Sequence, residues 1–162
     1  MKTVLMIRHA KSSWSDLSLK DFDRPLNDRG EANAALMAKR LDKKKLGIDY
    51  FITSPALRAQ TTASIMAKEL GLKKSHVLFV PSLYEPTVHA FYSAIASAPD
   101  DANTIAVVSH NPGITDFVNT LTTTRMDDMP TAAIFAVTAD TNDWAGFSTA
   151  EKKFLFYDQP KS

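Results

Sequence analysis

The chain has 162 residues, of which 44% are hydrophobic and 23% are charged, and its formal net charge is +1. This balance predicts one globular domain over residues 1–162 and excludes the disordered and fibrous classes, while the near-neutral charge gives no sign of a nucleic-acid or membrane partner. The absence of cysteine excludes disulfides, thiolate catalysis and cysteine-ligated zinc.

The first predicted element is a buried strand over residues 4–7. Four consecutive apolar residues form this run, which is short and rich in β-branched side chains, as is typical of a strand. Arg8 and His9 follow it directly. Ligands of open α/β sheets bind beyond the carboxyl ends of the strands, so this pair is a candidate site. Taken alone, the same pair would be interpreted as part of a surface loop.

A long polar loop and two helices come next in the chain. The loop covers residues 11–29, and Asp28 with Glu31 is interpreted as the capping pair of a helix that ends near the lysines at 43–45. After a strand at residues 50–53, Ser54 and Pro55 predict the start of a second helix, which Gly71 ends.

Arg58 falls in the first turn of this second helix. A helix N-terminus and a guanidinium group together suit a phosphate. A surface arginine remains the alternative interpretation at this point.

The remaining elements continue the alternation of strands and helices. Strands are expected at 77–80 and 104–109, helices at 88–95 and 114–121, and the tail predicts an antiparallel pair of strands at 132–137 and 154–157. The strand at 104–109 ends at His110, as the first strand ends at His9. The pattern predicts a single α/β doubly wound domain, in which two histidines at two strand ends can face one pocket.

Common catalytic motifs are absent from the sequence, including the glycine-rich nucleotide loops, the His-Glu-x-x-His zinc motif and the Gly-x-Ser-x-Gly elbow. What remains is the set Arg8, His9, Arg58 and His110, which suits a dianionic phosphoryl group. Arginine forks can neutralise the phosphoryl oxygens, and a neutral imidazole is a competent nucleophile toward phosphorus. We expect the arginines to keep His9 neutral and a bound phosphate to favour a protonated His110.

Several spaced motifs are similar to those of one family. They are Arg8-His9-Ala10-Lys11-Ser12, Asp23-Arg24-Pro25-Leu26 with Arg29-Gly30, Ser54-Pro55-x-x-Arg58-Ala59-x-x-Thr62, Leu83-Tyr84, Ser109-His110-Asn111-Pro112, Pro130-Thr131-Ala132 and Pro160-Lys161. Together they resemble the histidine phosphatase superfamily, and within it the small phosphohistidine phosphatases of the SixA type. The usual Arg-His-Gly of the superfamily is Arg-His-Ala here, which removes no catalytic group.

The resemblance implies a three-layer α/β/α fold of the phosphoglycerate mutase type, with a central, mostly parallel sheet and one antiparallel strand. It also implies that His9 is the phosphorylated nucleophile, that Arg8, Arg58 and His110 hold the phosphate, and that Asn111 contacts the substrate. No cofactor or metal is implied.

The proton donor to the leaving group is open at this stage. Glu85 resembles the position where larger members carry an acidic donor, and an exposed loop glutamate is an equal alternative. Asp16, Asp23 and Arg24 are second-rank candidates for substrate contacts.

The resemblance, together with these residues, implies a metal-independent phosphatase acting on phosphohistidine in a protein. The alternatives are a small-molecule phosphomonoesterase, such as a sugar-phosphate phosphatase, and a module that only recognises phosphate. No signal peptide or membrane-spanning run is evident, so a cytoplasmic location is expected.

Overall fold

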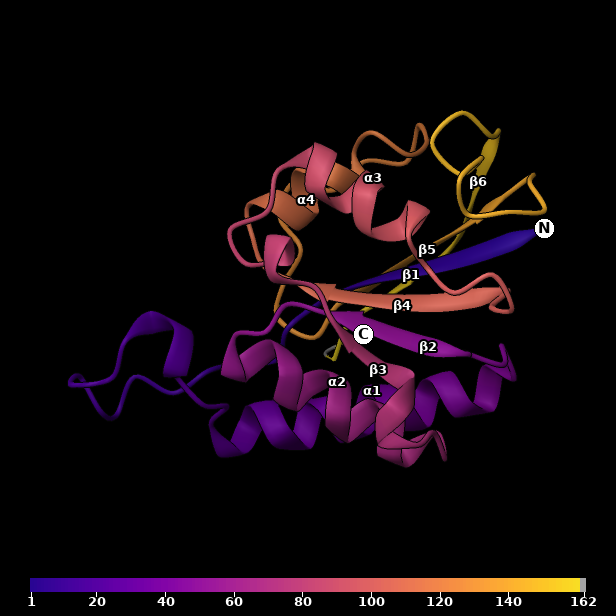
Figure 1. The fold of residues 1–162 in the computed structure, drawn as a ribbon. Coiled ribbons are helices and arrows are strands. Elements are labelled where there is room, and N and C mark those ends of the chain that lie inside the picture. Colours follow the sequence, from indigo (N-terminus) through magenta and orange to yellow (C-terminus); the bar gives the residue numbers. More distant parts are fainter. Residues whose placement is uncertain (161–162) are drawn as a thin grey trace.

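A computed structural model describes residues 1–160, so that Lys161 of the final motif lies outside the described residues. Its centre is a six-stranded sheet with the order β3-β2-β4-β1-β5-β6 (Figure 1). The elements are β1 (Lys2–Arg8), α1 (Asp28–Lys44), β2 (Tyr50–Thr53), α2 (Leu57–Glu69), β3 (Val77–Phe79), α3 (Val88–Ala96), β4 (Thr104–Ser109), α4 (Gly113–Val118), β5 (Ile134–Ala139) and β6 (Lys152–Asp158), with short 3-10 turns at Asp21–Asp23, Lys74–His76 and Pro81–Leu83.

The sheet is mostly parallel. β1 pairs in parallel with β4, and β2 pairs in parallel with both β4 and β3. β5 pairs antiparallel with β1 on one side and with β6 on the other. β5 is therefore the single strand that runs against the rest, which confirms the predicted sheet and the predicted antiparallel pairing of the tail.

Helices cover both faces of this sheet: α1 and α2 lie on one face, and α3 and α4 lie on the other (Figure 1). In β1, Val4 and Met6 pack with the α3 and α4 side chains, whereas Leu5 and Ile7 pack with those of α1 and α2. Successive side chains of a strand point to opposite faces, so a strand covered on both sides must be apolar throughout. This explains the uninterrupted apolar runs of the sequence and confirms the three-layer fold.

The structure corrects the predicted N-terminal ends of α1 and α2. The N-cap of α1 is Asn27, whose side chain accepts a hydrogen bond from the Gly30 backbone N–H at 2.8 Å, and Asp28 is already helical. Asparagine and aspartate cap about equally well, so adjacent candidates cannot be ranked from sequence. α2 begins at Leu57, two residues later than predicted. Its N-cap position is held by Ala56 and not by Ser54, whose side chain is described below.

None of the helices within residues 1–160 is long and apolar enough to cross a membrane.

The position of the α1 cap leads to a stability test. We expect Asn27→Ala to lower the free energy of unfolding by about 1 kcal/mol, because it leaves the Gly30 N–H without its acceptor. Asp28→Ala removes only a favourable charge near the helix N-terminus and should cost about 0.3 kcal/mol. Urea unfolding of both variants checks the order. A larger loss for Asp28→Ala would identify Asp28 as the cap.

Candidate active site

The two histidines meet because β1 and β4 are neighbours in register. Arg8 lies opposite Ser109 in the parallel ladder, so that His9 and His110 leave their strands side by side. The His9 backbone N–H donates to the Ser109 carbonyl at 3.1 Å, and the two imidazole rings lie 5.0 Å apart, centroid to centroid. The predicted convergence of residues about a hundred positions apart is confirmed.

Arg58 and Arg8 bring positive charge to these rings. Arg58 lies in the first turn of α2, as predicted, and it is buried there, unlike the surface arginine of the alternative interpretation. The half-buried Arg8 is held by a 2.8 Å hydrogen bond from Nη1 to the Met129 carbonyl. Both guanidinium groups lie close enough to His9 to lower its pKa. Beside them opens a cavity of about 360 Å³, lined by Asp21, Arg58, Tyr84, Glu85, Pro86, His110, Asn111, Pro112, Gly113 and Asp116.

Three donors in this site are buried and have no partner. Within residues 1–160, they are Arg8 Nε, Arg58 Nε and His110 Nδ1. A buried donor left without an acceptor costs about 1–3 kcal/mol, so three in one place indicate a site shaped for an acceptor-rich ligand. A tetrahedral oxyanion supplies acceptors in several directions at once, and it also suits the two cations.

The hydrogen bond of His9 decides which of its nitrogens can react. Nδ1 lies 2.7 Å from the carbonyl oxygen of Ala10, an acceptor only, so Nδ1 carries the proton. Nε2 therefore keeps its lone pair. Burial lowers the pKa of His9 to about 4, and the charges of Arg58, Arg8 and Arg24 act in the same direction, although the Ala10 hydrogen bond opposes them. His9 is thus a neutral imidazole with a free nitrogen, as predicted.

His110 has the complementary arrangement. Its Nε2 lies 2.7 Å from Ser54 Oγ, and that oxygen already accepts a bond from the Ala56 N–H at 3.2 Å. Ser54 Oγ can donate its hydroxyl proton to Nε2, and in that tautomer His110 carries its own proton on the unpartnered Nδ1. Sequence reasoning missed this role of Ser54, because serine before proline is also an ordinary helix-start signal.

In the free site, His110 is not yet protonated. Burial lowers its pKa to about 3, with further contributions from His9 and Arg58. The predicted difference in protonation, a neutral His9 and a protonated His110, is therefore absent without a ligand. A bound dianion is the charge that would favour a cationic His110.

Thr62 fixes the backbone beside His9. Its hydroxyl donates to the Arg58 carbonyl at 2.8 Å and accepts from the Ala10 N–H at 3.0 Å. One threonine thereby joins the α2 turn that carries Arg58 to the residue after His9. Ala10 is fully buried at this position, so the methyl group that departs from the family's glycine is accommodated.

Asp21 is the member of the site that sequence reasoning missed. Its carboxylate lies 3.0 Å from Arg58 Nη2 and 2.7 Å from the Tyr84 hydroxyl, and its backbone carbonyl accepts from Arg58 Nη1 at 2.7 Å. Arg24 contacts the other carboxylate oxygen at 3.2 Å. Burial opposes the ionised form, but the bonds from Tyr84 and Arg58 lower the pKa of Asp21 to about 2.

These contacts attach the loop between β1 and α1 to the site. The loop extends past the carboxyl ends of the strands (Figure 1). The one local clue was the i,i+3 spacing of Asp21 and Arg24; the partners Arg58 and Tyr84 are distant in sequence. Asp21 uses both Nη atoms of Arg58 and leaves Nε for a ligand.

The second-rank candidates lie apart from the histidines or act indirectly. Asp16 is exposed and accepts bonds from Ser18, and Asp23 is also exposed. Arg24 is buried between Asp21 and the Trp14 ring, whose centroid is 3.6 Å from the guanidinium carbon. We interpret Arg24 as an anchor of the loop.

Glu85 and Asn111 both line the cavity beside His110. Glu85 is exposed, and its carboxylate forms no ion pair within residues 1–160. Its backbone has a φ of 54°, a left-handed conformation that costs about 1–2 kcal/mol for an L-residue. Asn111 donates to the Asp128 carboxylate at 2.6 Å and to the Met129 carbonyl at 3.0 Å, and accepts from Thr115. These bonds tie it to the segment before β5, so substrate contact by Asn111 stays a prediction.

Metal ligation has no obvious place in the described chain. Among residues 1–160, no three His, Cys, Asp or Glu side chains are grouped so as to hold a metal ion.

Comparison with known proteins establishes the family. The sequence model of the histidine phosphatase superfamily (branch 1) matches residues 4–85. The chain belongs to this superfamily. An uncharacterized chloroplastic protein of Arabidopsis thaliana is 35% identical over 120 residues, 69% of this chain and 55% of that protein. A 2,3-bisphosphoglycerate-dependent phosphoglycerate mutase of Methylobacterium radiotolerans is 30% identical over 86 residues, 52% of this chain and 41% of the mutase. The chain thus matches only about half of the length of these curated relatives.

A solved structure matches nearly all of this chain. The protein histidine phosphatase SixA, complexed with tungstate, superposes with a TM-score of 0.82 at 25% identity, covering 98% of this chain and 97% of that one. In fold the chain is a SixA-type member of the superfamily.

The depressed histidine pKa values predict how stability depends on pH. An ordinary histidine has a pKa of 6.5, whereas those of His9 and His110 in the folded protein are about 4 and about 3. The unfolded chain therefore binds more protons below pH 6.5, and we expect the free energy of unfolding to fall as the pH falls from 6.5 toward 4. Urea unfolding across this range and histidine NMR at pH 6, which should show both rings neutral, check the expectation. A charged His9 or His110 at pH 6 would contradict it.

Proposed function

We propose that the chain is a metal-independent phosphatase that works through a phosphohistidine intermediate on His9, and that its substrate is phosphohistidine in a protein. The observation that carries the proposal is the free Nε2 of neutral His9 beside three unpartnered buried donors. In phosphoryl transfer the protein mainly positions the group and stabilises its charge. Two arginines and His110 supply that charge stabilisation without a metal.

The reaction has two displacements. In the first, His9 Nε2 forms a bond to phosphorus while the bond from phosphorus to the substrate nitrogen breaks, and the leaving imidazole keeps the proton it carries or takes one. In the second, water attacks the phosphorus of phospho-His9, the bond to Nε2 breaks, and inorganic phosphate leaves. Arg8, Arg58 and His110 hold the phosphoryl oxygens in both steps.

Two observations support a protein-borne substrate. The cavity opens at the carboxyl edge of the sheet, where exposed residues such as Glu85 and Asp116 form its rim. The fold also matches a protein histidine phosphatase over 98% of the chain, at 25% identity. The catalytic group is therefore reachable by a phosphohistidine that projects from another protein.

A small-molecule phosphomonoesterase is the second candidate, because sequence relatives include phosphoglycerate mutases. Such an enzyme must protonate an alkoxide leaving group, which is a poorer leaving group than a protonated imidazole. Glu85 is the acidic side chain on the rim that would serve this purpose.

The first test is to trap the intermediate. Brief mixing with a phosphohistidine peptide should label the wild-type chain with a phosphoryl group that is stable to alkali and labile to acid. His9→Ala should give neither label nor turnover, and a chelator should leave both unchanged. His89→Ala is the matched control, because His89 is exposed on α3 and does not line the catalytic cavity.

The outcomes separate the candidate functions. Turnover of phosphohistidine peptides well above that of simple phosphoesters supports the proposal, and the reverse preference supports the phosphomonoesterase. Tight peptide binding with neither label nor turnover would indicate a phosphate-recognition module instead.

Glu85→Gln tests the proton donor. We expect phosphoester turnover to fall roughly a hundredfold, because general acid catalysis is lost, and phosphohistidine turnover to change little. Asp116→Asn, at another exposed acid of the same rim, is the matched control. Equal losses on both substrates, or no loss on either, would exclude Glu85 as the donor.

A further inference from the structure

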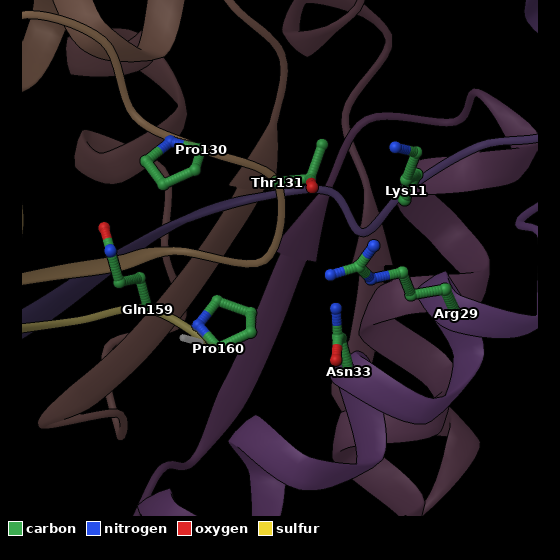
Figure 2. A pocket seen from close by; sticks show the side chains of 7 residues that line it. All are labelled: Lys11, Arg29, Asn33, Pro130, Thr131, Gln159 and Pro160. Atoms are coloured by element: carbon green, nitrogen blue, oxygen red, sulfur yellow. The ribbon is translucent and has the colours of Figure 1, made fainter. Parts of the chain in front are cut away.

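A second cavity lies at the same edge of the sheet, on the other side of the end of β1. Its volume is about 210 Å³ (Figure 2). It is lined by Lys11, Arg29, Asn33, Pro130, Thr131, Gln159 and Pro160. The reaction proposed above uses none of these residues, although several belong to motifs of the sequence analysis.

Among residues 1–160, the charged side chains that line this cavity are all positive. Its charged lining residues are Lys11 and Arg29, and neither forms an ion pair in the described part of the chain. Figure 2 shows the Arg29 guanidinium reaching into the space between Asn33 and Thr131. The amide of Asn33 and the hydroxyl of Thr131 can donate hydrogen bonds beside the two cations. The lining thus has the chemistry of an anion site.

The backbone holds the two cations together. The Asn27 N–H donates to the Lys11 carbonyl at 3.0 Å, which fixes the start of the loop on the first turn of α1. A Cβ atom at Gly30 would lie 2.1 Å from the same carbonyl oxygen, so glycine is required for this approach. The backbone positions of Lys11 and Arg29 therefore follow from contacts within the chain.

The same backbone joins this cavity to the catalytic one. Lys11 is two residues after His9. On the opposite wall, the Ala132 N–H next to Thr131 donates to the carbonyls of Arg8 and His9, at 3.0 and 3.2 Å. The end of β1 thus connects Lys11 and Thr131, which line this cavity, with His9, whose ring lies 5.0 Å from that of His110 in the lining of the catalytic cavity. One polypeptide lying along this edge can reach both.

We propose that the cavity of Lys11 and Arg29 binds a carboxylate side chain, aspartate or glutamate, of the protein whose phosphohistidine occupies the catalytic cavity. A guanidinium fork pairs with a carboxylate in two parallel hydrogen bonds, and the lysine adds a second positive charge. This inference rests on the proposed function and adds a substrate feature to it: an acidic residue at a fixed offset from the phosphohistidine.

The test uses two matched series of synthetic phosphohistidine peptides. In one series a single glutamate is moved from position to position, and in the other glutamine takes its place. For the wild-type chain we expect glutamate to lower KM about tenfold relative to glutamine at one position or at adjacent positions, with kcat unchanged. The preference should weaken as salt is added, because the cavity is open to solvent.

The double variant Lys11→Ala/Arg29→Ala should lose the glutamate preference and keep the wild-type turnover of phosphoramidate, which is too small to reach the second cavity. Both side chains are exposed, so their removal leaves the core intact. Lys43→Ala/Arg125→Ala removes the same charges from exposed positions outside both cavities and should behave as wild type.

Turnover of all peptides without any glutamate preference overturns this inference alone. A preference that survives in the double variant also overturns it, as does an equal loss of phosphoramidate turnover. Failure of the wild-type chain to dephosphorylate any peptide overturns the proposed function itself.

Discussion

The site depends on one backbone constraint, the parallel pairing of β1 with β4 in a register that sets Arg8 opposite Ser109. Each strand is covered on both faces, so a shift by one residue would exchange the side chains that face the two helical layers and is strongly disfavoured. The core thereby fixes the position of the two imidazoles. The geometry of the site therefore follows from the packing of β1, which buries two side chains against each helical layer: Val4 and Met6 on one face, Leu5 and Ile7 on the other.

The electrostatics of the site follow from the same burial. Burial and the nearby arginines lower the pKa of both histidines, so both rings are neutral in the free protein. Asp21 pairs with the two Nη atoms of Arg58 and leaves its Nε without a partner. The free protein therefore already has its donors in place, and little reorganisation is needed when a phosphoryl group binds.

Much of this arrangement was predictable from sequence. The short apolar runs ending at His9 and His110 predicted strands whose carboxyl ends carry the chemistry, and the N-terminal turn after residue 53 predicted the place of Arg58. These signals are local, and they hold because a buried strand and a helix start have clear residue preferences.

The parts that could not be predicted depend on contacts between distant segments. Asp21 meets Arg58 across 37 positions, and Ser54 meets His110 across 56. In the local sequence, only the i,i+3 spacing to Arg24 distinguishes Asp21 from Asp16 and Asp23. Ser54 precedes a proline, and that pair is also an ordinary helix-start signal. The cap of α1 was misplaced by one residue for the same reason, because Asn27 and Asp28 have similar preferences and only the backbone geometry separates them.

The central claim is that Arg8, Arg58 and His110 converge with His9 on one tetrahedral anion, and a crystal structure of the chain with tungstate tests it most directly. The account predicts tungstate oxygens within hydrogen-bond distance of Arg8 Nε, Arg58 Nε and His110 Nδ1, with His9 Nε2 facing the tungsten atom. Tungstate bound elsewhere, with those three nitrogens still unpartnered, would contradict it.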